Sequence, residues 1–226
     1  MISRPIFTAL TLSALGAALT VPSDAEASRY HRRHRVYEVV ITNLTRGQIL
    51  SPPIVATHRP GFRIFEVGMP ASPELAAVAE DAVNAGLETL LDGSSRVFDR
   101  QTGGAPIPPG QSAALEITAD RWATRLSSVG MLVVTNDAFF GFNGVKLPNW
   151  GSRTYRAVAY DAGSEANTED CDDIPGPPCG NPGVRQTVDA EGYVHVHAGI
   201  HGLADLVPSR HDWRNPTVQI TITRIR

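Results

Sequence analysis

The segment MLVVTNDAFFGFNGVKLPNWGSRTYRAVAYDAGSE, residues 131–165, decides the fold that we expect for this chain. It opens with four apolar residues, Met131 to Val134, a run typical of a short buried strand. Polar residues follow, and Asn143-Gly144 is a strong turn signal. Residues Tyr155 to Tyr160 predict a second strand that leads directly into an acidic loop. Strands that end in polar loops in this way favour a β-sandwich.

Four side chains of this segment offer oxygen atoms to a metal ion, namely Asp137, Asn143, Asp161 and Glu165. If the two strands lie in one sandwich, their loops bring these side chains together at one end. Calcium prefers carboxylate and amide oxygens on loops. The segment therefore predicts a calcium site, while the alternative that Asp and Asn only terminate the strands stays open.

Residues 71–91 predict the one clear helix of the chain. Ser72 is placed to cap it, Pro73 occupies the first helical position, and Gly93 lies just past the end. Its apolar residues fall on one stripe, so we expect the helix to pack against a sheet. The stripe consists of Leu75, Ala79, Ala82, Val83, Leu87 and Leu90.

The other strands show alternating or apolar patterns. Residues 217–225 and 112–118 alternate between apolar and polar, and residues 36–44 form a first strand. Residues 50–58 contain two adjacent prolines, which predict an edge strand or an extended loop. We therefore predict an all-β fold over residues 36–226, an antiparallel β-sandwich of about eight strands with one inserted α-helix.

The N-terminus predicts export. Residues 1–27 combine a positive charge at Arg4, an apolar stretch and small residues at Ala25 and Ala27, the pattern of a signal peptide cleaved after Ala27. Residues 28–35 are basic, and we expect a disordered tail there. No later segment is long enough to span a membrane. The expected location is therefore periplasmic or secreted.

Cys171 and Cys179 are the only cysteines of the sequence. An even pair in an exported chain predicts a disulfide, with free thiols or a metal pair as alternatives. The net charge of −3 over 226 residues is close to balanced, so nothing indicates a nucleic-acid partner.

His195, His197 and His201 form a second candidate metal set. Alternate strand positions would place His195 and His197 on one face, and three imidazoles can hold a zinc ion that activates water. The alternative is that Val194 and Val196 face the core and the histidines face solvent. The sequence contains neither a G-x-S-x-G nucleophile elbow nor a phosphate-binding loop.

Aromatic residues follow the first acidic position of the central segment. They are Phe139, Phe140, Phe142 and Trp150. Exposed, they would form a contact patch beside the cation, because large aromatic side chains anchor interfaces. Buried, they would close the end of the sandwich.

Several separated motifs resemble the spondin domain, the F-spondin-type module of extracellular matrix proteins, and especially the bacterial exported proteins made of that domain alone. The motifs are TNDAFFGFNGVKLP, AYDAGSEANTED, YEVVITNLTRGQILSPPIVATH at residues 37–58, and HVHAGIHGLADL with DWRNPTVQITITRI near the C-terminus. They occur in order and cover nearly all of the expected mature chain.

The resemblance implies a C2-like sandwich of eight strands with one calcium ion held in its end loops. Its acidic ligands would correspond to Asp137, Asn143, Asp161 and Glu165, although Asn143 and Glu165 stand where the animal domains have Asp. We therefore expect an exported calcium-binding adhesion or surface-binding module without catalytic activity, whose partner is an extracellular or envelope protein or glycan. The alternatives are a zinc-dependent hydrolytic enzyme using His195, His197 and His201, and a metal-free structural envelope protein.

Overall fold

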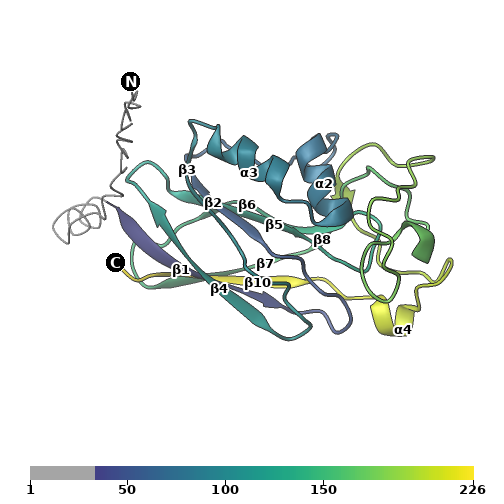
Figure 1. Ribbon diagram of the computed structural model, residues 1–226. Coiled ribbons are helices and arrows are strands. Elements are labelled where there is room, and N and C mark those ends of the chain that lie inside the picture. Colours follow the sequence, from purple (N-terminus) through teal and green to yellow (C-terminus); the bar gives the residue numbers. More distant parts are fainter. Residues whose placement is uncertain (1–33) are drawn as a thin grey trace, which may run out of the picture.

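The computed structural model describes residues 34–226, which form two antiparallel β-sheets packed face to face (Figure 1). The predicted all-β sandwich with a helical insert is confirmed, and the described residues contain ten strands. The predicted signal peptide and most of the predicted tail lie outside the described residues. Arg35, which we expected in the tail, is the first residue of a strand.

One sheet has four strands, in the order β4-β1-β10-β7. They are β1 (Arg35–Asn43), β4 (Ser112–Ala119), β7 (Ser152–Ala157) and β10 (Val218–Arg224). In β10, Val218, Ile220 and Ile222 are buried while the residues between them are partly exposed, as the alternation predicted. This sheet therefore buries one face and leaves the other to solvent.

The other sheet has six strands, in the order β3-β2-β5-β6-β8-β9. They are β2 (Ile54–His58), β3 (Val97–Thr102), β5 (Arg125–Met131), β6 (Ala138–Lys146), β8 (Ala159–Asp161) and β9 (His195–Val196). The expectation of an edge strand at residues 50–58 is wrong, because β2 pairs with β3 and β5 on its two sides. Pro52 and Pro53 precede β2, so neither removes a donor from its ladder.

Two helices cover the outer face of the six-stranded sheet (Figure 1). They are α2 (Pro73–Asp81) and α3 (Ala85–Asp92), where the sequence predicted a single helix. The chain breaks at Ala82, whose φ of 56° is left-handed. The break shifts the buried face, so Leu91 is buried while Val83 and Leu90 of the predicted stripe are exposed.

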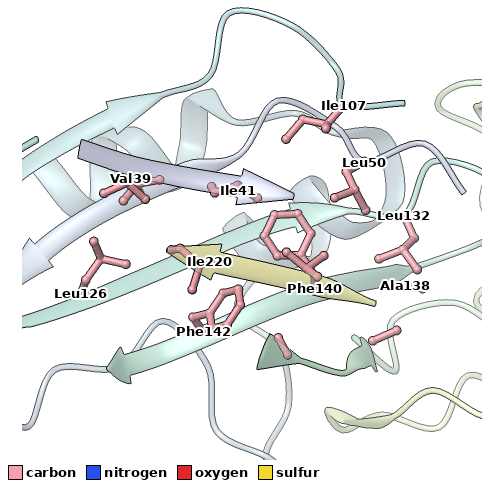
Figure 2. Close-up of a cluster of buried hydrophobic side chains, with 14 of the residues drawn as sticks. Val39, Ile41, Leu50, Ile107, Leu126, Leu132, Ala138, Phe140, Phe142 and Ile220 are labelled. Carbon is pink, nitrogen blue, oxygen red and sulfur yellow. The ribbon is translucent and has the colours of Figure 1, made fainter. Parts of the chain in front are cut away.

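The six-stranded sheet is consequently buried on both faces. Between the sheets, Ile41 of β1 and Ile220 of β10 pack in the same cluster as Phe140 and Phe142 of β6 (Figure 2). On the opposite face, Phe139 belongs to the cluster formed with the two helices. The three phenylalanines thus belong to a central strand and fill both cores.

The segment at residues 131–165 differs from the prediction in three places. The strand predicted at Met131 to Val134 is only the end of β5, which stops at Met131. Asn143-Gly144 is not a turn between strands but an irregularity inside β6, where the pairing with β5 skips a residue. Gly144 has a φ of 65°, the backbone geometry that glycine also supplies to turns. The predicted strand at residues 155–160 is divided at Val158, and its halves, β7 and β8, belong to different sheets.

The loops beyond β8 contain a short 3₁₀ helix, η1 (Cys171–Asp173), and a short helix, α4 (Pro208–His211). Cys171 and Cys179 form the predicted disulfide. Such bonds are typical of oxidising compartments, either extracellular or periplasmic. Among residues 34–226, no helix combines the length and the apolar character needed to span a bilayer.

Candidate metal centre

Strand register brings the candidate ligands to one end of the six-stranded sheet. Ala138, the first residue of β6, lies opposite Asp161 of β8, and Asp161 lies opposite His195 of β9. Directly opposed residues have Cβ atoms about 5 Å apart. Asp137 immediately precedes β6, so three neighbouring strands place Asp137, Asp161 and His195 close together.

Asp137 is fully buried, and its two carboxylate oxygens have different surroundings. Oδ2 accepts hydrogen bonds from the backbone N–H groups of Ser164, at 2.8 Å, and Glu165, at 3.0 Å. Oδ1 is buried and has no hydrogen-bond partner. One half of the carboxylate therefore fixes the loop after β8, and the other half is left to bind a cation or a proton.

Asp161 is also fully buried, and a tight turn surrounds it. Its Oδ1 accepts from the backbone N–H of Gly163 at 2.7 Å, and its Oδ2 accepts from Asn167 Nδ2 at 2.7 Å. A Cβ atom on Gly163 would lie 2.4 Å from the carbonyl oxygen of Tyr193. Glycine at this position therefore lets the chain around Tyr193 approach, which delivers the neighbouring Glu191 and His195 to the site.

We call Asp137, Asp161 and Glu165 the carboxylate cluster, because the charge of Asp161 acts on Asp137 and the charge of Asp137 acts on Glu165. Among the described residues their oxygen atoms do not form a group within 4.8 Å of one another. Glu165 is buried, and its Oε1 has no hydrogen-bond partner. The nearby guanidinium of Arg185 is paired with Glu80 and Asp81 of α2. That arginine already serves two carboxylates, so it leaves the negative charge of the cluster largely uncompensated.

Burial, and after it neighbouring negative charge, raises the pKa values of the three carboxylates. Burial, together with the charge of Asp161, raises the pKa of Asp137 to about 7. Burial, with the charges of Glu80 and Asp137, raises the pKa of Glu165 to about 8. Burial also raises the pKa of Asp161, against the hydrogen bonds from Asn167 and Gly163. Each carboxylate is therefore costly to ionise unless a cation is bound.

A further set of side chains adjoins the cluster, and we call it the mixed site: Asp161, Glu191 and His195. One ligand atom from each lies within 4.8 Å of the other two, and together they can hold a metal ion. Glu191 was missed in the sequence, because it comes from an irregular loop without any motif. Its position depends on the approach of that loop to Gly163, which the sequence does not show.

Among the described residues the three histidines of the second predicted set do not form one metal-binding group, although the charges of His195 and His201 both act on His197. His197 is buried and Val196 is exposed, so the alternative with both valines facing the core is also wrong. His197 Nε2 lies 3.9 Å from Asp161 Oδ2. Burial, with the nearby His195, lowers the pKa of His197 to about 4. His201 is exposed, and its backbone N–H donates to Glu169.

Asn143 does not lie in the cluster. It is six residues along β6 from Asp137, a distance of about 20 Å in a strand. Its Oδ1 accepts from the Ile64 N–H at 3.0 Å, and its Nδ2 donates to the carbonyl of Phe65. Asn143 therefore holds the loop between β2 and α2 against β6.

The aromatic residues do not form a patch at this site. Phe139, Phe140 and Phe142 are buried within β6, as described above. Trp150 is 85% exposed and follows the far end of β6. The nine residues of β6 span about 30 Å, which places Trp150 at the opposite end of the sandwich.

No protein-family model matches the chain, and no curated protein matches it. The resemblance to spondin domains therefore stays a prediction that rests on the sequence motifs. Function is therefore inferred from the geometry of the site.

Proposed function

We propose that this protein is an exported, calcium-binding surface module of the spondin type, without catalytic activity. Residues 1–27 would direct its export, and the carboxylate cluster would hold the calcium ion. A partner on the cell envelope or outside the cell, a protein or a glycan, would then bind the calcium-loaded form.

The observation that carries the proposal is the state of the carboxylate oxygens. Asp137 Oδ1 and Glu165 Oε1 are buried without hydrogen-bond partners, and the charge of the fully buried Asp161 acts on Asp137. Buried ionised groups are destabilising unless an opposite charge meets them. A calcium ion supplies two positive charges and takes oxygen ligands from loops, which matches this set of donors.

A melting experiment tests this function. A ligand that binds only the folded state raises the melting temperature in proportion to the logarithm of its concentration, well above its dissociation constant. We expect calcium to raise the melting temperature of chelator-treated protein, and we expect this rise to disappear in Glu165→Gln. Asp172→Asn, an exposed acidic residue outside the cluster, is the matched control and should respond like the parent.

The alternatives predict other results. A metal-free envelope protein would melt at the same temperature in chelator and in calcium. The zinc hydrolase with three histidine ligands loses its main support, because His201 is not part of the group around Asp161. A rise in melting temperature that persists in Glu165→Gln would contradict the assignment of the cluster.

A further inference from the structure

His195 and His197 both face Asp161, but their hydrogen bonds give them different chemistry. The Nδ1 atom of His197 lies 2.9 Å from the backbone nitrogen of Gly199. An amide N–H only donates, so Nδ1 accepts and the proton of the neutral ring lies on Nε2. His197 therefore directs an N–H group toward Asp161 Oδ2 and has no lone pair there for a metal.

His195 has the reverse arrangement. Its Nδ1 lies 3.1 Å from the carbonyl oxygen of Val196, which only accepts, so Nδ1 carries the proton. The neutral ring then presents a lone pair on Nε2, which is buried and without a hydrogen-bond partner. Metal-binding histidines commonly donate their other ring N–H to a backbone carbonyl in this way.

The distances around His195 fit a shared ion. Its Nε2 lies 3.6 Å from Asp161 Oδ1 and 3.9 Å from Glu191 Oε1. Both separations exceed the roughly 2.7–3.2 Å of a direct N–H···O hydrogen bond. Two atoms that each bind one zinc ion at about 2.1 Å can be up to about 4.2 Å apart. Both separations fall within that limit.

We propose that Asp161, Glu191 and His195 form a second cation site, which takes a zinc-class divalent metal rather than calcium. Imidazole with carboxylate suits zinc, whereas calcium takes oxygen ligands. The side chain of His197 is 2% exposed and its Nε2 lies 3.9 Å from Asp161 Oδ2, beyond a direct hydrogen bond, so His197 packs beside the site without binding the ion. The site shares Asp161 with the proposed calcium site but does not depend on calcium being bound there.

Three protein ligands leave a fourth position for a water molecule. Glu191 is exposed and the side chain of His195 is 26% exposed, so the ion can enter from solvent.

The test is a titration of the purified full chain, after removal of metals by a chelator. Zinc binding is measured by calorimetry, and cobalt(II), a spectroscopic substitute for zinc, by its visible absorption. We expect His195→Gln and Glu191→Gln each to weaken zinc binding by more than about 100-fold. His197→Gln should weaken zinc binding less than either, because His197 Nε2 makes no hydrogen bond to Asp161. His201→Gln, an exposed histidine outside the site, should bind zinc like the parent.

Two controls separate this inference from the proposed function. Asp137→Asn should lose the calcium response and keep zinc binding, while His195→Gln should keep the calcium response, which also shows that it folds. If His195→Gln does not fold, Glu191→Gln decides the question from an exposed position. Equal zinc affinity in the parent and in the folded variants at His195 and Glu191 would overturn the second site.

Nuclear magnetic resonance of the histidine side chains gives an independent readout of the ligand atom. Zinc should shift the Nε2 resonance of His195, and the Nδ1-acceptor form of His197 should persist. A zinc-dependent change at His197 Nε2 with none at His195 would also overturn the assignment.

Discussion

Glu169 and Asp137 are buried carboxylates at the same loop end of the sandwich, but their oxygens differ in hydrogen bonding. In Glu169, Oε1 accepts from the His201 N–H at 2.6 Å, and Oε2 accepts from Gly202 and Leu203 at 2.6 and 2.8 Å. In Asp137, Oδ2 is bonded while Oδ1 has no partner. Burial alone therefore does not identify a metal ligand. What distinguishes Asp137 as a candidate ligand is its unpaired oxygen beside the charge of Asp161.

The two carboxylates therefore have different structural roles. Backbone N–H groups compensate Glu169, which fixes the loop at residues 201–203 without any ion. Asp137 fixes its loop with one oxygen, and its other oxygen has no hydrogen bond. Variants at the two positions should consequently change stability with opposite signs in the metal-free protein.

The largest effect is expected for Glu169→Ala. This variant leaves three backbone donors without their acceptor, and hydrogen bonds to charged groups contribute roughly 1.5–3 kcal/mol each, not additively. We expect a loss of about 3 kcal/mol in the free energy of unfolding, measured by urea denaturation in chelator. Glu169→Gln, which keeps one acceptor oxygen, should lose less. A loss below about 1 kcal/mol in Glu169→Ala would show that the loop does not depend on this carboxylate.

Asp137→Asn should instead stabilise the metal-free protein. The amide oxygen can keep the bonds from Ser164 and Glu165, and a buried negative charge disappears. Burial raises the pKa of Asp137 to about 7, so keeping this carboxylate ionised is costly; at about 1.4 kcal/mol per pKa unit, we expect the variant to gain roughly 1–3 kcal/mol. In saturating calcium the order should reverse, with the parent melting at the higher temperature. Destabilisation by Asp137→Asn in chelator would contradict the uncompensated charge.

The pH dependence separates the same two states. The pKa values of Asp137 and Glu165 are raised by burial to about 7 and about 8, so the folded metal-free protein binds protons that the unfolded chain does not. Its stability should therefore increase as the pH falls from 8 to 6.5. Below about 6.5 the lowered pKa values of His58, His197 and His211 act in the opposite direction.

Melting curves recorded between pH 8 and 6.5 test this slope. For a chain of this size, a change of 1 kcal/mol in stability shifts the melting temperature by about 2–4 °C. Calcium-loaded protein should show the opposite slope, because protons compete with the ion. The Asp137→Asn variant should show a shallower slope in chelator. If the slope is the same with and without calcium, the groups that titrate in this range are not the groups that bind calcium.

Local sequence patterns predicted much of the fold, and the remainder depends on contacts between distant segments. The alternation at residues 217–225 predicted the buried face of β10, because each apolar side chain reports its own position. The same reasoning could not find the break at Ala82, since alanine favours helix and only packing shows the change of phase. Asn143-Gly144 was misread because a positive φ serves a turn and a bulge equally well.

The candidate site was predictable to a similar degree. Asp137 lies just before β6 and Asp161 is the last residue of β8, so the strand pattern located both residues. The register of the two strands then brings them together. Glu191 and His195 reach the site only because Gly163 admits the chain around Tyr193, a contact between segments about thirty residues apart. Asn143 looked like a ligand by residue type, but both ends of its amide are used by backbone groups. Residue type suggested the candidates. The hydrogen bonds leave Asp137 Oδ1 and Glu165 Oε1 unpaired, whereas both oxygens of Asp161 accept hydrogen bonds.

Asn143→Asp gives the smallest expected effect and a sharp control for the comparison. The change supplies the acidic residue that the family pattern would call for, but it replaces the donor to the Phe65 carbonyl with an acceptor. We expect a loss of about 1–2 kcal/mol in stability, the cost of one unsatisfied group that is partly buried. The calcium-induced rise in melting temperature should be unchanged, because position 143 lies far from the cluster. A tighter calcium affinity in this variant would instead place residue 143 among the ligands.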